Sequence, residues 1–192
     1  MTLPKTPARQ KVYRLSISLK YDCRIWRTVL VEGGVSLDEL HRIIQAVMGW
    51  DNYHMHCFVV RGRRYGEGGG ELGFEDEADV TLSDLVSRSG QKLEYEYDFG
   101  DSWWREIRVE KIIPPTEALN YPVCIAGERA CPPEDCGGLG GYQRLLQILN
   151  DPAHPEHKEM LEWVGGSFDP ELFDLAEANI RLRPLRPRAR RE

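Results

Sequence analysis

KLEYEYDFGDSWWREIRVEKII, residues 92–113, is the stretch of sequence that decides the fold. Its first part alternates apolar side chains with Glu and Asp, which is typical of a half-buried strand. A Gly-Asp-Ser turn at residues 100–102 reverses the chain, and a second strand pattern continues until two prolines end it. The pattern predicts an antiparallel hairpin whose first strand, residues 92–99, points four side chains inward: Leu93, Tyr95, Tyr97 and Phe99.

Toward the N-terminus, the sequence predicts a second hairpin followed by a helix. Residues 12–20 and 25–31 have strand patterns, with a short turn between them. Ser36 and Glu39 have the spacing of a capping box, and Gly49 is placed to end the helix. The helix would bury one stripe of apolar side chains: Leu37, Leu40, Ile43, Ile44 and Val47.

The middle of the chain is predicted to hold one more strand and a short helix. Residues 54–61 alternate, which would place His54 and His56 on one face of a strand. A glycine-rich acidic loop at residues 66–79 follows, and then a capped helix over residues 81–86.

The last third of the chain is predicted to be a long loop and three helices. Residues 116–141 lack periodicity and are rich in Pro, Gly and Cys. Apolar spacing predicts helices over residues 142–149 and 155–164, and a third that begins after the cap residue Asp169.

The resulting element order, ββα-β-α-ββ-loop-ααα, indicates an α+β fold with a mostly antiparallel sheet covered by helices. A single domain is expected over residues 12–182. A flexible basic N-terminus, residues 1–11, and a basic Arg/Pro tail, residues 183–192, would flank it.

The composition excludes several classes of protein. The net charge of −6 combines basic ends with an acidic body, which disfavours a broad nucleic-acid face and leaves only the basic ends for such contacts. No apolar run approaches the ~20 residues of a membrane span, and the first residues lack the apolar core of a secretory signal. Five cysteines without a CxxC pair suggest free thiols in a reducing cytoplasm.

Three short segments concentrate side chains that bind ligands or transfer protons. Residues 97–103 (YDFGDSW) put two carboxylates at a hairpin tip between aromatic side chains, and residues 131–138 (CPPEDCGG) put two more in a stiff turn. A cleft built from these segments and the His-x-His strand would contain His54, His56, Asp98, Asp101, Trp103, Arg105, Glu134, Asp135 and Tyr142.

These segments together resemble the plasmid pRiA4b ORF-3-like family, whose members are also described as TnpR-like passenger proteins of insertion elements. The resemblance covers residues 13–182 and includes Met48-Gly49-Trp50, Trp163 and Phe168-Asp169-Pro170. It implies a compact α+β domain associated with mobile elements, without an established biochemical role. Recombinase chemistry is not expected, since no nucleophilic Ser lies among arginines. Where the family commonly has His, this chain has Arg105.

The residues leave several functions open. A non-catalytic binding or accessory module, with a small-molecule or protein partner, is favoured over an enzyme. A metal-dependent hydrolase is the alternative, with a divalent transition metal on His54, His56, Asp98 and Asp101. Further alternatives are nucleic-acid association through the basic ends and a structural zinc on Cys124, Cys131 and Cys136 with His154 or His157.

Overall fold

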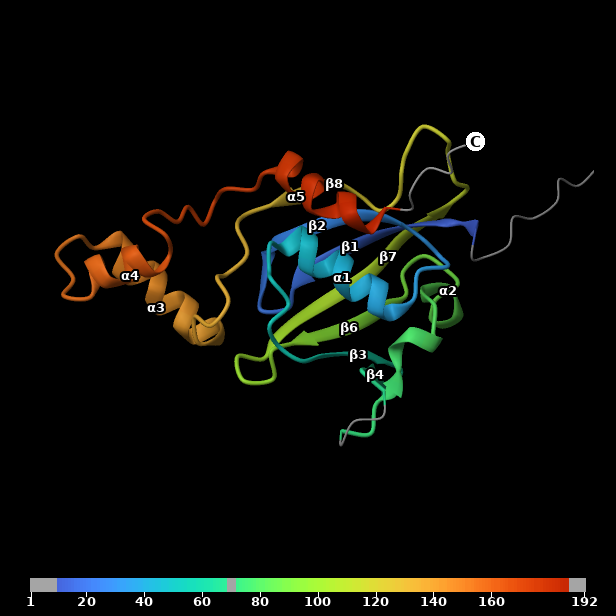
Figure 1. The fold of residues 1–192 in the computed structure, drawn as a ribbon, viewed down its shortest axis with the longest axis horizontal. Coiled ribbons are helices and arrows are strands. Elements are labelled where there is room, and N and C mark those ends of the chain that lie inside the picture. Colours follow the sequence, from blue (N-terminus) through green and yellow to red (C-terminus); the bar gives the residue numbers. More distant parts are fainter. Residues whose placement is uncertain (1–9, 69–71, 187–192) are drawn as a thin grey trace, which may run out of the picture.

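A mostly antiparallel sheet of eight strands organises the described residues, 10–68 and 72–186, of the computed structural model (Figure 1). The strand order is β5-β4-β3-β6-β7-β1-β2-β8, and only the short β4–β5 pair is parallel. The predicted α+β class is therefore confirmed. The strands are β1 (Val12–Leu19), β2 (Asp22–Glu32), β3 (His56–Val60), β4 (Arg63–Gly66), β5 (Glu75–Asp76), β6 (Lys92–Tyr97), β7 (Trp103–Ile113) and β8 (Val123–Glu128).

Four of the helices occupy two separate places, and the short α2 lies apart from both (Figure 1). Helices α1 and α5 pack against each other over the sheet, whereas α3 and α4 form a pair that projects beyond one end of it. The helices are α1 (Leu37–Met48), α2 (Leu82–Leu85), α3 (Gly138–Asn150), α4 (His157–Trp163) and α5 (Leu175–Leu182), with 3₁₀ turns η2 (Glu77–Asp79) and η3 (Arg183–Leu185).

Helix α1 begins and ends as its sequence predicts. Ser36 and Glu39 form the capping box, in which the backbone N–H of Ser36 donates to Glu39 Oε2 at 2.9 Å. Gly49 ends the helix with φ 82°, a left-handed conformation that glycine adopts without a steric penalty. The predicted apolar stripe is buried against the sheet, so the helix is stabilised mainly by packing.

The core lies between α1 and the inner face of the sheet. Every second side chain of β1, β6 and β7 is buried there, as the period of two requires. Truncating one of these fully buried aliphatic side chains would cost about 2–5 kcal/mol. They include Leu15, Ile17, Leu93, Ile107 and Val109, all at most 1% exposed.

Two short strands, β5 and β8, lie where the sequence predicts loops, and a third, β4, follows the strand predicted for residues 54–61. Strand β8 pairs with β2 inside the long loop, and β4 and β5 flank the glycine-rich segment. On β8, the side chain of Asn179 in α5 binds both the N–H and the C=O of Cys124, at 3.1 and 2.8 Å. This strand is covered partly by a polar side chain, which is why it lacks the alternation that sequence analysis detects.

The last helices begin later than their patterns predict. Helix α4 starts at His157, and α5 starts after Asp174, whose carboxylate accepts from the N–H groups of Ala176 and Glu177. The carboxylate of Asp169 accepts from the N–H of Glu171 and closes only a turn.

The hairpin tip and the start of β3 also differ from the prediction. Strand β6 ends at Tyr97, and Asp98 adopts a left-handed φ of 56°, so Phe99 points outward and is 37% exposed. Strand β3 begins at His56 and not at His54. His54 and His56 therefore do not share a strand face.

Candidate functional site

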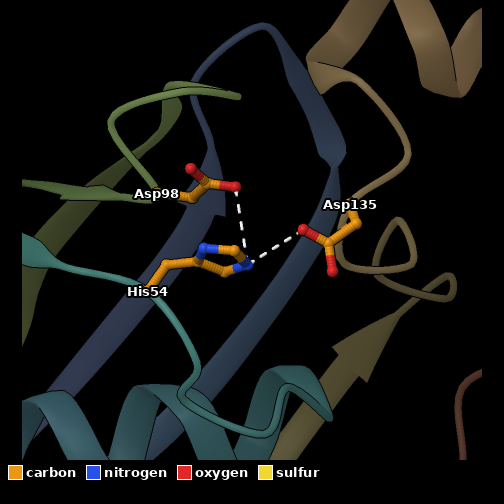
Figure 2. Close-up of side chains that lie close together, drawn as sticks. All are labelled: His54, Asp98 and Asp135. Carbon is orange, nitrogen blue, oxygen red and sulfur yellow. Dashed lines mark ion pairs between the residues drawn. The ribbon is translucent and has the colours of Figure 1, made fainter.

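His54, Asp98 and Asp135 come from three separate segments and meet beside the β6–β7 hairpin (Figure 2). His54 Nε2 lies 3.1 Å from Asp135 Oδ1 and 3.8 Å from Asp98 Oδ2. Their ligand atoms all lie within 4.8 Å of one another, and no other group of three or more His, Cys, Asp or Glu in the described residues does this. His54 Nε2 is buried, and it has no aligned hydrogen-bond partner among those residues.

Asp98 is held by its own turn. Its Oδ1 accepts from the backbone N–H groups of Gly100 and Asp101, at 2.9 and 3.3 Å. Its own N–H donates to the carbonyl of Met55 at 2.9 Å. The left-handed backbone at Asp98 is one that Asp tolerates better than most residues. These bonds leave Oδ2 directed at His54.

The hydroxyl of Tyr97 joins the segment before β3 to the loop before α3. It accepts from the N–H groups of Tyr53 and His54, at 2.9 and 3.3 Å, and donates to Glu134 Oε1 at 2.5 Å. Burial, together with the Glu134 carboxylate, raises the pKa of Tyr97, so the hydroxyl keeps its proton. Tyr97 therefore fixes where His54 lies relative to the loop that carries Asp135.

The loop before α3 is held on both sides of Asp135. Glu134 Oε2 accepts from the N–H of Asp51 at 2.8 Å. On the other side, the N–H of Gly137 donates to Asp101 Oδ2 at 3.1 Å. Asp135 itself has a left-handed φ of 59°, and its side chain is 66% exposed. The cluster is consequently preorganised and open to solvent at Asp135.

Two of the four metal ligands expected from the sequence lie elsewhere. The carboxylate of Asp101 is occupied by the loop contact with Gly137. His56 points away, because the strand that would have paired it with His54 begins at His56, two residues later than predicted. Its Nε2 lies 2.8 Å from Oε2 of the buried Glu77. The structure brings His54 and Asp98 together with Asp135 instead.

His56 belongs to a second polar cluster. Its ring stacks on that of His41 with centroids 3.4 Å apart and planes 3° from parallel. Burial, and then the neighbouring His56, lowers the pKa of His41 to about 3, so His41 is neutral at pH 7. His41 Nε2 lies 2.7 Å from Asn52 Oδ1, an acceptor, so Nδ1 accepts the proton of the Tyr95 hydroxyl at 2.8 Å.

His41→Gln is expected to flatten the loss of stability in acid. In the unfolded chain the imidazole has a pKa of about 6.5, well above its pKa in the folded chain. At pH values between these two pKa values, the unfolded chain therefore binds more protons than the folded chain. The free energy of unfolding therefore falls as the pH drops, by at most about 1.4 kcal/mol per pH unit from this group. Urea unfolding at a series of pH values from about 7 to 4 measures the slope. Equal slopes in the variant and the wild type would contradict this assignment.

A cavity of about 1100 Å³ lies between α1, the segment before β3 and the glycine-rich segment. We call it the His41–Phe99 cleft. Both His54 and His56 line it, whereas Asp98, Asp101, Glu134 and Asp135 are not part of its described lining. Its described lining comprises Asp38, His41, Arg42, Asn52, Tyr53, His54, Met55, His56, Glu67, Gly68, Leu72, Phe74, Glu77 and Phe99.

Comparisons with known proteins give the family. A family model described as plasmid pRiA4b ORF-3-like protein matches residues 11–177. The chain belongs to this family. The uncharacterized protein y4hQ of Sinorhizobium fredii (strain NBRC 101917 / NGR234) is 38% identical over 173 residues, covering 88% of this chain and 87% of that protein. The crystal structure of the protein of unknown function MM3350 from Methanosarcina mazei Go1 has a TM-score of 0.79 and 39% identity, covering 87% of this chain and 97% of that one.

The resemblance found in the sequence motifs is thus confirmed. Neither name states an activity, so the chemistry of this pRiA4b ORF-3-like protein has to come from its own geometry. Within the described ranges, no helix is long and apolar enough to cross a bilayer.

Three of the expected cleft residues are buried in the core instead. Trp103, Arg105 and Tyr142 are at most 3% exposed and none lines the His41–Phe99 cleft. Arg105 stacks over Trp50, with Cζ 4.0 Å from the ring centroid, and donates to Cys131 Sγ at 3.1 Å. Among the described residues, no partner accepts from its Nε or Nη1. Arg105 therefore packs in the interior beneath the loop that carries Cys131.

The cysteines and histidines of the zinc alternative do not converge in the described residues. Burial raises the pKa of Cys124 and Cys131, and that of Cys136 to about 12, so these thiols are neutral at pH 7. His154 accepts a backbone N–H through Nδ1, and His157 Nδ1 lies 2.9 Å from the carbonyl of Ile148.

The basic C-terminal segment begins as part of the domain. Arg186 donates to the carbonyl of Pro122 at 3.1 Å and to Asn179 at 3.2 Å. Arg181 lies 3.4 Å from Glu177 and 3.7 Å from Asp51. The rest of the tail, residues 187–192, and residues 1–9 of the N-terminus lie outside the described residues.

Sequence analysis missed four contributors to these sites. They are the hydroxyl of Tyr97, the two buried side chains of His41 and Glu77, and the outward-pointing side chain of Phe99. Tyr97 and His41 sit at positions that a strand or helix pattern assigns to packing, and Glu77 lies in the segment predicted to be a glycine-rich acidic loop. The turn residues after Tyr97, Asp-Phe-Gly, were the one available signal for the fourth.

Proposed function

We propose that this protein is a binding module that holds a divalent transition metal between His54, Asp98 and Asp135. The observation that carries the proposal is the buried Nε2 of His54, which faces two carboxylate oxygens without an aligned hydrogen bond. An ion between them would satisfy all three groups. It would also offset the repulsion between the two carboxylates.

The two distances from His54 suit such an ion, and the two carboxylate oxygens lie within 4.8 Å of each other. Ligand atoms at about 2.0–2.2 Å from a metal in tetrahedral or octahedral geometry lie about 3.0–3.5 Å apart. The contact of 3.1 Å already has this length, and that of 3.8 Å would have to close only slightly. One imidazole with two carboxylates suits Zn²⁺, Mn²⁺ or Fe²⁺, whereas Ca²⁺ prefers a shell of oxygens.

A metal-dependent hydrolase is the second candidate. Three protein ligands would leave a coordination position for water, and the exposed side chain of Asp135 gives solvent a route to it. We rank binding first because the neighbouring proton-transfer groups, the Tyr97 hydroxyl and the Glu134 carboxylate, are already hydrogen-bonded to each other and to backbone N–H groups. An accessory role beside a mobile element is the setting that the family resemblance suggests, and the metal proposal does not depend on it.

Calorimetric titration of the metal-stripped full chain with Zn²⁺ and Mn²⁺ tests the proposal. We expect one ion per chain for at least one of them, and much weaker binding of Ca²⁺. His54→Ala and Asp135→Asn should each weaken binding by about 100-fold or more, because even groups behind a metal ligand are worth 10–100-fold. Glu159→Gln, which removes an exposed carboxylate on α4, is the matched control and should change nothing.

The proposal fails if neither ion binds stoichiometrically to a folded chain. It fails equally if both ligand variants bind as the wild type does, since the ion would then lie elsewhere.

A further inference from the structure

The His41–Phe99 cleft has an apolar rim above a polar floor. Tyr53, Met55, Leu72 and Phe99 are 76%, 57%, 52% and 37% exposed, although each is a large apolar side chain. Phe74 joins them, with its ring 6.2 Å from that of Phe99 in an edge-to-face contact. Apolar side chains gathered at one opening mark a surface that a ligand or partner covers.

The floor of the cleft is a hydrogen-bonded network that includes the carboxylate of Glu77. The buried Glu77 lies 2.8 Å from His56, whose ring is fixed by its stack on His41. His41 is itself anchored by Tyr95 and Asn52. A buried, hydrogen-bonded network of this kind holds its groups in place before a ligand arrives.

The charge of the lining selects the kind of ligand. Its carboxylates are Asp38, Glu67 and Glu77, and its only guanidinium or ammonium among the described residues is Arg42. Arg42 pairs with Asp38 one helical turn away. The neutral His41 adds no positive charge, so the described lining sets three carboxylates against one guanidinium. An anion would be repelled there, and a cation would be attracted.

We propose that this cleft binds a small organic cation, an ammonium group joined to an apolar body. The ammonium would be held by Glu67 and by the faces of Phe74 and Phe99, since aromatic rings attract cations. The apolar body would cover Met55 and Leu72. The cavity volume is close to the upper limit of about 1000 Å³ for small-molecule sites, which favours a free small molecule over a protein partner. This proposal does not rest on the metal at His54, because none of the groups that hold the cation is a ligand of that ion.

The test is to titrate the full chain with matched small-molecule probes in buffer containing EDTA, which removes bound metal. Binding is measured from the NMR chemical shifts of the backbone amides. Benzyltrimethylammonium should bind saturably and shift the amides of residues 52–56 and 74–77. Benzoate, with a similar ring and the opposite charge, should not bind, and tetramethylammonium should bind more weakly than the benzyl compound. Phe99→Ala and Glu67→Gln should each weaken the cation by about threefold to fivefold.

Tyr21→Ala is the control, because it removes an exposed aromatic ring from the turn between β1 and β2, away from the cleft. It should leave the affinity unchanged. No saturable binding of the cation, equal binding of benzoate, or an affinity indifferent to both cleft variants would overturn the proposal. Asp135→Asn should still bind the cation, because Asp135 is a candidate metal ligand that does not line the described part of the cleft, so failure of the metal site and failure of the cleft are distinguishable.

Discussion

Gly141→Ala is expected to lower the free energy of unfolding by about 3 kcal/mol, the upper range for forcing extra atoms into packed structure. A Cβ at this position would lie 1.8 Å from the carbonyl oxygen of Cys136 and 2.7 Å from its carbonyl carbon. Both are backbone atoms, so no side-chain rotation relieves the clash. The first turn of α3 and the loop before it would have to separate, and the N–H of Gly141 would lose its 3.0 Å bond to the carbonyl of Gly137.

The same change should weaken the metal site, because Asp135 immediately precedes Cys136. We expect the affinity for Zn²⁺ or Mn²⁺ to fall by about 10-fold or more, the range for groups that orient a metal ligand. Urea unfolding measures the first effect and calorimetry the second.

The neighbouring glycine supplies the control. A Cβ at Gly140 would meet nothing within 4 Å. Gly140→Ala, inside the same helix, should therefore raise stability by up to about 1 kcal/mol through helix propensity and leave metal affinity unchanged. If both variants behave alike, α3 does not lie as close to the loop as we describe.

The parts of this fold that the sequence predicts are those governed by local rules. The capping box of α1, its glycine end and the buried face of the β6–β7 hairpin depend on residues a few positions apart. Strand β8 could not be predicted in this way. The side chain of Asn179, 55 residues further along the chain, binds the backbone N–H and C=O of Cys124 at the edge of this strand. No pattern within the sequence of β8 predicts such a distant partner.

The candidate site, like the fold, could be predicted only in part from the sequence. Its residue types were visible, and His54, Asp98 and Asp135 were all expected in one cleft. That these three residues form one cluster could not be predicted, because the cluster depends on backbone segments that do not have the strand conformation. Asp98 and Asp135 both adopt left-handed φ values, and the N–H groups of residues 53 and 54 bind a side-chain hydroxyl instead of a neighbouring strand. A strand of strict period two would have paired His54 with His56.

Tyr97→Phe should separate the role of the Tyr97 hydroxyl from that of its ring. Without the hydroxyl, Glu134 Oε1 loses a donor, and the N–H groups of Tyr53 and His54 lose an acceptor. Leaving such groups unsatisfied costs about 1–3 kcal/mol, while the buried ring keeps its packing against Trp50. The metal affinity should fall by about 10–100-fold, because the hydroxyl is what holds His54 and the Asp135 loop at a fixed separation.

Tyr95→Phe is the decisive comparison, since the two tyrosines lie on the same buried face of β6. The hydroxyl of Tyr95 accepts from Gln45 at 2.9 Å and donates to His41, so its loss should reduce stability by a similar amount. It touches neither the segment of His54 nor the loop of Asp135, and metal affinity should therefore stay at the wild-type value. If both variants lost metal affinity equally, the loss would report general loosening of the domain, and the positioning role assigned to Tyr97 would be wrong.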